Sequence, residues 1–122
     1  MITHIDIAGV KYSLDETTKK YVNKKIGRLD RYLPKKDRDG VRAEVKLKEV
    51  NRDHGNKYEC EVLLFVPDKT LMAKDTTVNM LAAVDIVEEK LKNQLKKYKS
   101  ERTNHRGRHD LLGKMKRSFR RG

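Results

Sequence analysis

Lysine side chains are concentrated in one short stretch of the sequence, KLKNQLKKYKS at residues 90–100, which contains five of them. Leu91, Leu95 and Tyr98 recur in this stretch at i, i+4 and i+7, the spacing of one face of an α-helix. The lysines then occupy the other faces, where like charges one turn apart repel each other. Phosphate groups would neutralise such a surface, so the stretch indicates binding to a polyanion.

A second row of cations lies in the segment 15–33, which we predict to be a helix. Lys20, Lys24, Arg28 and Arg31 follow each other at spacings of four, four and three residues, with Lys25 beside them. Side chains one helical turn apart are separated by about 5–6 Å and can follow the phosphates of a nucleic-acid backbone. A solvated helix face is the alternative explanation of each row.

The two rows share one outer surface if the two helices pack side by side on a sheet. We expect the nearby acids, Asp30, Glu88 and Glu89, not to balance these cations. Contacts to phosphate and to RNA shape should dominate over base reading, because aromatic residues are few. The candidate binding residues are Lys24, Lys25, Arg28, Arg31, Lys90, Lys92, Lys96, Lys97, Lys99 and Arg102.

Composition sets the class of molecule in which these rows lie. The chain has 122 residues and a formal net charge of +12, with 36% hydrophobic and 39% charged residues. This length suggests one domain, and the charge favours nucleic acid or an anionic membrane surface as the partner. The single cysteine, Cys60, excludes an internal disulfide and fits a reducing cytoplasm. We expect no signal peptide and no membrane-spanning segment.

Periodicity predicts the elements that position the cations. Alternating apolar residues indicate strands at about 3–9, 41–50, 57–66 and 70–76, and helical spacing indicates helices at 15–33 and from about 78 onward. Either Ser13 with Glu16, or Asp15, would cap the first helix. The predicted fold class is α+β: a β-α-β-β-β-α two-layer sandwich whose mostly antiparallel four-stranded sheet carries both helices on one face.

The helical pattern breaks after about residue 102, and we divide the chain there. Residues 1–102 form the predicted binding domain, and residues 103–122 form a basic tail with seven Lys/Arg and one Asp. We expect the tail to be disordered when unbound. Leu111, Met115 and Phe119 lie at helical spacing, so folding of the tail on a partner is the alternative.

Catalytic and metal-binding patterns are weak in this sequence. His105 and His109 are four residues apart, but no cysteine pair or acidic cluster accompanies them as in a zinc site. Asp85 and Glu89 share a helix face, which is common on solvated helices. Cys60 lies on the apolar face of a strand. We therefore predict no enzyme activity, no catalytic residues, no cofactor, no metal and no small-molecule substrate.

Two segments resemble one known family. YVNKKIGRLDRY and AAVDIVEEKLKNQLKKYK, in this order and spacing, are similar to the ribosome hibernation-promoting factors and the related ribosome-associated inhibitors, over about residues 2–102. The resemblance implies a fold related to double-stranded RNA-binding domains. It also implies that the domain binds rRNA of the small ribosomal subunit between head and body, where mRNA and the A- and P-site tRNAs lie. Translation would stop, and the idle ribosome would be protected.

The resemblance extends to individual residues. The positions that match the family's basic residues are Lys25, Arg28, Arg31, Lys90, Lys97 and Lys99. Asn93 stands where the family usually has arginine, and Leu81 where it often has tyrosine. Long members carry a separate domain that pairs ribosomes, and 20 residues cannot hold one, so we expect a short member and leave dimerisation of ribosomes open.

These observations lead to one preferred function and two alternatives. We expect a cytoplasmic protein, monomeric when unbound, whose partner is the small ribosomal subunit, with neither a membrane nor a small molecule as partner. A general double-stranded RNA-binding protein is the main alternative. A membrane-surface protein that binds through its basic tail is the other.

Overall fold

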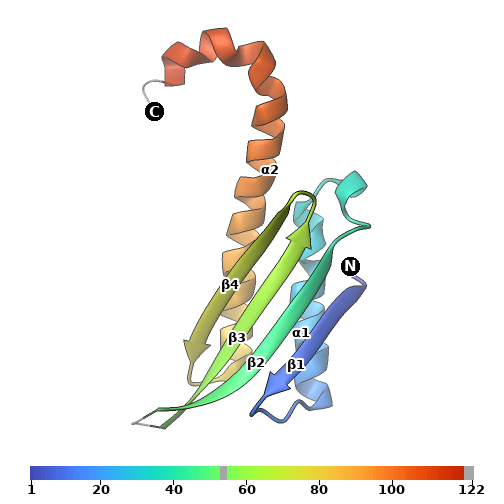
Figure 1. Cartoon of the computed structure of the whole chain (residues 1–122), viewed down its shortest axis with the longest axis vertical. Coiled ribbons are helices and arrows are strands. Elements are labelled where there is room, and N and C mark those ends of the chain that lie inside the picture. The colour runs from blue at the N-terminus through green and yellow to red at the C-terminus, as the bar shows by residue number, and fades with distance from the viewer. Residues whose placement is uncertain (53–54, 120–122) are drawn as a thin grey trace.

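The computed structural model describes the backbone of residues 1–52 and 55–119 and the side chains of residues 1–50 and 57–101. The elements follow the order β-α-β-β-β-α, with two short 3₁₀ helices after the first α-helix (Figure 1). They are β1 (His4–Val10), α1 (Glu16–Gly27), η1 (Arg28–Tyr32), η2 (Lys35–Asp37), β2 (Arg42–Arg52), β3 (Gly55–Val66), β4 (Lys69–Thr77) and α2 (Met80–Phe119). The predicted α+β fold class is confirmed.

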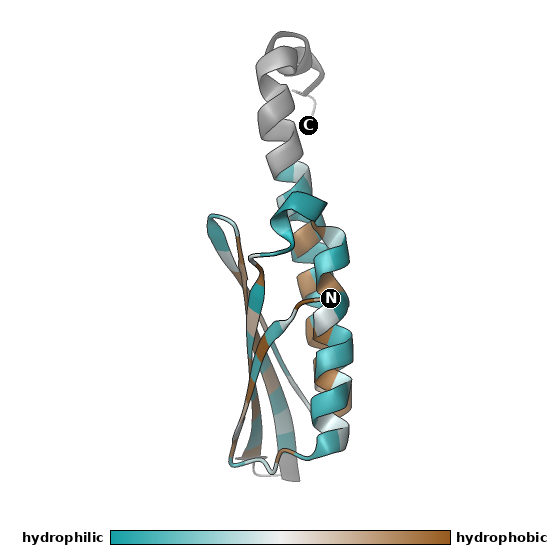
Figure 2. Ribbon diagram, turned by 90° about the vertical axis from the view of Figure 1, so that its right-hand side faces the viewer, coloured by the Kyte–Doolittle hydropathy of each residue, from teal (hydrophilic) through white to brown (hydrophobic). Residues whose placement is uncertain are grey.

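The four strands form one sheet in the order β1-β2-β3-β4. β1 pairs with β2 in parallel, whereas β2–β3 and β3–β4 are antiparallel, so the sheet is mostly antiparallel as predicted. A two-residue turn, Pro67–Asp68, joins β3 to β4. Asp68 has φ 63°, a left-handed conformation that aspartate tolerates in turns. Both helices cover the same face of this sheet and leave the other face open (Figure 2).

The core lies between the sheet and the two helices. Val22, Ile26 and Leu29 contribute the apolar side of α1 and η1, and Leu91 and Leu95 that of α2; all five are fully buried. The strands contribute the alternate residues that the sequence pattern places inward. These are Ala43, Val45, Leu47, Cys60, Val62, Leu64, Leu71 and Ala73. Helical and strand periodicity therefore identified the buried residues correctly.

The first helix is shorter than predicted. Asp15 caps its start, because Oδ1 accepts a hydrogen bond from the Thr18 amide at 2.7 Å. α-Helical geometry ends at Gly27 rather than at residue 33, and the chain continues as the 3₁₀ helix η1. The carbonyl of Gly27 accepts a hydrogen bond from the Ile2 amide at 2.9 Å, which gives it a partner outside the helix. Contact with the N-terminal segment therefore accompanies the tighter turn.

The second helix begins two residues later than predicted. The side chain of Asn79 caps it by accepting a hydrogen bond from the Ala82 amide at 3.1 Å. α2 includes the backbone of residues 103–119, whose side chains lie outside the described residues. The division at residue 102 and the disorder of the unbound tail thus stay predictions. In the part of the chain that the structure describes, no helix is both long and apolar enough to cross a lipid bilayer.

Candidate nucleic-acid interface

α1 and α2 lie side by side and run in the same direction, so their outward surfaces form one helical face (Figure 1). Five side chains bridge them: Tyr21, Lys25 and Arg28 from α1 and η1, and Asp85 and Glu88 from α2. We call these five residues the interhelical seam. Their spacing brings them together, since i, i+4 and i+7 on one helix face i and i+3 on its parallel neighbour.

Each seam cation has a carboxylate partner. Arg28 donates from Nε to Glu88 Oε2 at 2.6 Å and from Nη2 to Glu88 Oε1 at 3.2 Å. Lys25 Nζ lies 3.2 Å from Asp85 Oδ1 and 3.6 Å from Glu88 Oε1. The hydrogen bonds to these carboxylates raise the pKa of Arg28 and of Lys25, so both stay cationic.

Tyr21 completes the seam. Its hydroxyl donates a hydrogen bond of 2.6 Å to Asp85 Oδ1, and this bond is the main reason that the pKa of Tyr21 is raised. Asp85 thus holds Tyr21 and Lys25 together.

The seam corrects one expectation from the sequence. We expected the acids near the cationic rows not to balance them, but Asp85 and Glu88 pair with Lys25 and Arg28 across the two helices. The expectation was wrong for this half of the helical face. The pairing results from the relative placement of the helices, which brings the acids of one directly against the cations of the other.

The other half of the helical face carries more positive charge. Arg31 and Lys96 approach the Tyr32 ring from η1 and α2, each with its charged group 5.9 Å from the ring centroid. Lys92 pairs at 3.4 Å with Glu89 of its own helix, and the exposed Lys99 continues the row. We call Arg31, Lys92, Lys96 and Lys99 the cationic end. It brings together predicted site residues from η1 and from α2, and among the described side chains it pairs with one carboxylate, that of Glu89.

Lys90 does not join this group. Its Nζ donates to the main-chain oxygen of Lys74 at 3.0 Å and lies 3.3 Å from Asp75 Oδ1, on the opposite side of α2 from α1. Gln94, one turn on, donates to the main-chain oxygen of Met72 at 2.9 Å. These bonds occupy two outward carbonyl groups of the edge strand β4, which disfavours pairing with another strand there. Lys97, seven residues after Lys90, falls on the same side by helical spacing.

The remaining predicted site residues are dispersed. Lys24 is exposed on α1, and among the described side chains it forms no ion pair. Arg102 lies outside the residues whose side chains are described. Sequence reasoning missed the role of Tyr21, Asp85 and Glu88, although the matching spacings on the two helices were a signal that could have found them.

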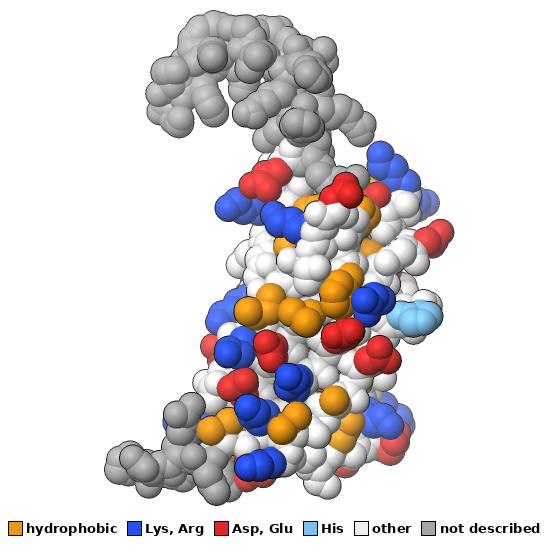
Figure 3. Space-filling model, in the orientation of Figure 1, with side chains coloured by type: hydrophobic (Ala, Val, Ile, Leu, Met, Phe, Trp, Pro, Cys, Tyr) orange, Lys and Arg blue, Asp and Glu red, His pale blue; other side chains and the backbone are white. Residues whose placement is uncertain are grey.

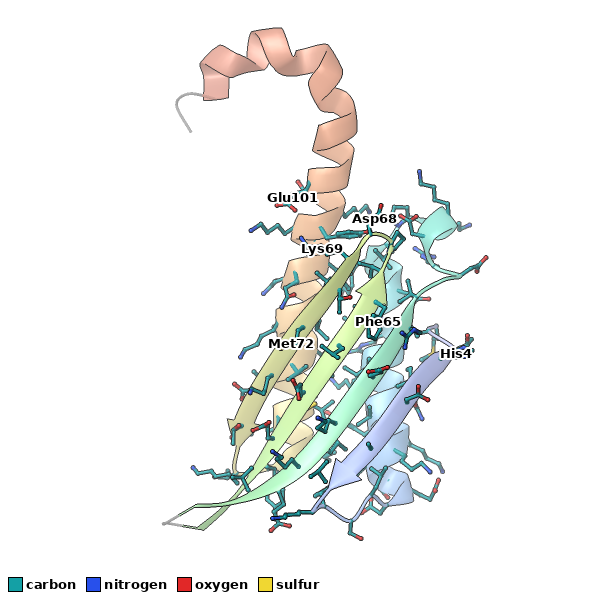
Figure 4. All side chains as sticks on the ribbon, viewed as in Figure 1. His4, Phe65, Asp68, Lys69, Met72 and Glu101 are labelled. Carbon is teal, nitrogen blue, oxygen red and sulfur yellow. The ribbon has the colours of Figure 1, made fainter. Side chains whose placement is uncertain are left out.

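The outer face of the sheet has a different chemistry (Figures 3 and 4). The guanidinium of Arg42 stacks 3.9 Å from the centroid of the Phe65 ring, and Met72, on the neighbouring strand β4, is 49% exposed. Charges of both signs alternate around this apolar centre. Lys46 lies directly opposite Glu61 in the strand register.

The acidic, histidine and cysteine side chains could in principle form a catalytic or metal-binding arrangement. Within residues 1–50 and 57–101, no group of three or more His, Cys, Asp or Glu side chains is placed to hold a metal. Asp85 and Glu89, the pair with shared helix spacing, instead form ion pairs with Lys25 and Lys92. Burial raises the pKa of the Cys60 thiol to about 12, so this side chain is a poor nucleophile. His105 and His109 lie outside the described side chains.

The family model described as Sigma 54 modulation protein / S30EA ribosomal protein matches residues 5–103. The chain therefore belongs to this family, and the resemblance to hibernation-promoting factors noted in the sequence is confirmed.

Two curated relatives are both named ribosome hibernation promotion factor. The protein of Lactococcus lactis subsp. cremoris (strain MG1363) is 37% identical over 95 residues, which is 78% of this chain and 49% of that protein. The protein of Staphylococcus aureus (strain COL) is 29% identical over 95 residues, again 78% of this chain and 47% of that protein. The chain thus spans about half the length of these relatives.

Two solved structures share the fold. The N-terminal domain of Thermus thermophilus Protein Y matches with a TM-score of 0.66 at 24% identity, over 79% of this chain and 99% of that one. A ribosomal subunit interface protein from Coxiella burnetii matches with a TM-score of 0.65 at 25% identity, over 80% of this chain and 99% of that one.

Proposed function

We propose that this chain acts in ribosome hibernation. It binds rRNA of the small ribosomal subunit in the channel used by mRNA and tRNA, blocks the A and P sites, and protects the idle ribosome. The relatives named ribosome hibernation promotion factor support this function, as does the related ribosomal subunit interface protein. The chain works in the cytoplasm, as a monomer before it binds.

One observation carries the proposal: α2 and η1, the 3₁₀ helix that continues α1, present their cations on a single face. Arg31 from η1 and Lys96 from α2 meet at the same tyrosine ring, so the cationic end combines residues of these two elements. Such a surface can contact successive phosphates of a folded RNA without reading its bases. Inhibition by occupancy needs no catalytic group, cofactor or metal.

The first test adds the pure chain to small ribosomal subunits and measures co-sedimentation, binding of mRNA and tRNA, and integrity of the rRNA. We expect saturation near one chain per subunit, loss of mRNA and tRNA binding at the same ratio, and intact rRNA. Equal affinity for a naked RNA duplex would instead favour the general double-stranded RNA-binding protein. Inhibition far below one chain per subunit, with RNA cleaved, would indicate a nuclease.

Binding should also depend on salt. If roughly six phosphates are neutralised, the logarithm of the binding constant should fall against the logarithm of salt concentration with a slope of about −4 to −5. A slope near zero would contradict an interface made of phosphate contacts.

A further inference from the structure

Two carboxylates lie in the middle of a face that is proposed to contact phosphates. Asp85 and Glu88 repel a phosphate backbone, and a surface selected only for affinity for RNA would gain from their replacement. Both nevertheless occupy the interhelical seam. Glu88 is well covered there, with 13% of its side chain exposed, and it makes two hydrogen bonds to Arg28.

We propose that Asp85 and Glu88 determine the RNA specificity of the helical face. They fix Lys25 and Arg28 for phosphates that arrive at one position, and they disfavour phosphates that approach the seam at any other position, so that the face favours a folded RNA whose backbone also reaches the cationic end. This inference rests on the function proposed above and names residues that control it.

The hydrogen bonds of the seam hold Lys25 and Arg28 in fixed positions. Glu88 holds two of the three guanidinium nitrogens of Arg28, Nε and Nη2, in a planar bidentate arrangement. Lys25 is held between two carboxylates. A cation already fixed in one rotamer loses less conformational entropy when it meets a phosphate, and it meets only phosphates at one position. Arg28 remains 37% exposed, so it is accessible to RNA.

The seam attracts phosphate less than the cationic end does, because its charges are balanced. A phosphate that approaches the seam meets two cations and two carboxylates, whereas one that approaches the cationic end meets Arg31 and Lys96 beside Tyr32. Residues 88 and 96 are about 12 Å apart along the helix. Because this exceeds the screening length of about 8 Å at physiological salt, the seam acids discourage phosphate locally and leave Lys96 and Lys99, the part of the cationic end farther along α2, largely unaffected.

The neighbouring residue supplies a matched control. Glu89 carries the same charge on the same helix, but 62% of its side chain is exposed, and its described ion pair is with Lys92 of α2. Glu88→Gln and Glu89→Gln therefore remove the same charge, and only the first removes it from the seam. Dissociation constants for small ribosomal subunits and for a naked RNA duplex are measured for both variants and the parent.

The two variants should distinguish the effect of where a carboxylate lies from the effect of its charge alone. Glu88→Gln should raise affinity for the naked duplex about threefold, the effect of one screened unit charge nearby. Its affinity for subunits should stay the same or fall, because Arg28 is less firmly held. The preference for subunits over duplex then narrows at least threefold. Glu89→Gln should change both affinities by the same factor and leave this preference intact.

An equal effect of both variants on the preference, or no effect of Glu88→Gln, would overturn the inference. Asp85→Asn is a second variant in case Glu88→Gln does not fold, since the Asp85 side chain is 46% exposed and tolerates loss of charge more readily. It should also narrow the preference. If the parent shows no preference for subunits, the proposed function itself fails, and that outcome is read from the parent alone.

Discussion

The two broad faces of the molecule are both rich in charged side chains but arrange them differently. On the outer face of the sheet, opposite charges lie directly across from each other in the strand register, as with Lys46 and Glu61 and with Lys48 and Glu59. On the helical face, cations form rows that continue beyond the seam. The comparison shows that the net charge of +12 reveals little about where an anion binds, whereas the arrangement of charges does.

The two sides of the sheet also differ in how far their apolar side chains are buried. Leu91 of α2 is fully buried against the inner face, whereas Met72 on the outer face is half exposed. Leu91→Ala should lower the free energy of unfolding by about 2–5 kcal/mol because it leaves a cavity in the core. Met72→Ala should change it by less than about 0.5 kcal/mol. Urea unfolding followed by circular dichroism measures both, and a similar cost at the two sites would contradict the assigned core.

Charge reversal compares the two faces directly in binding. The double change Arg31→Glu and Lys96→Glu should weaken binding to small ribosomal subunits by about a hundredfold, because two charge-assisted contacts to phosphate are lost. The matched double change Lys46→Glu and Lys74→Glu alters the net charge equally on the outer sheet face. It should weaken binding by no more than about threefold. If both pairs weaken binding alike, the helical face is not the binding surface.

Strand β3 contributes side chains to both faces of the sheet, and one of its inward side chains makes the stability of the fold depend on pH. Cys60 points inward, and burial raises the pKa of its thiol to about 12. The unfolded chain loses this proton near pH 9 while the folded chain keeps it, so the stability present at neutral pH falls as pH rises from about 9 toward 12. Between pH 9 and 10.5 the loss is roughly 2 kcal/mol.

The measurement is urea unfolding at pH 8 and at pH 10.5 for the parent and for Cys60→Ala. The variant lacks the thiol and should lose less stability over this range, although it is less stable at pH 8. Parallel loss in the two proteins would show that Cys60 ionises as readily in the folded chain as in the unfolded one.

The smallest expected effect lies within the helical face itself. Tyr21→Phe removes the hydrogen bond to Asp85 and should lower the free energy of unfolding by about 1 kcal/mol. Lys20→Ala, on the exposed side of the same helix, should be close to neutral. Urea unfolding of both variants compares them, and equal stabilities would mean that the seam does not hold the helices together.

The sequence predicted those parts of the structure that depend on the spacing of apolar residues within one helix or strand. Burial of Val22, Ile26, Leu91 and Leu95 follows from helical spacing, since each element must turn one apolar side to a core. The order of elements and the one-sided covering of the sheet followed from the same patterns. Predicted residues of η1 and α2, Arg31 and Lys96, meet on one face.

What the sequence could not predict depends on contacts between distant elements. The end of α1 at Gly27 involves a hydrogen bond from Ile2, which periodicity within the helix does not contain. The pairing of Arg28 with Glu88 depends on how two helices are placed side by side, 60 residues apart in the chain. Lys90 belongs by spacing to a cationic row, yet the position of β4 gives it two partners there, the main-chain oxygen of Lys74 and the side chain of Asp75.

Which face of the chain meets the small-subunit rRNA decides the proposed function most directly. Asn93→Cys on the exposed side of α2 and Met72→Cys on the outer sheet face each provide an accessible thiol for a tethered iron–EDTA group, while Cys60 is buried and stays unlabelled. Hydroxyl radicals released from each position in the complex cut the RNA nearby. We predict strong cuts around the mRNA and tRNA channel from position 93 and weak or no cuts from position 72. Strong cuts from position 72 alone, or cuts away from that channel, would contradict the account.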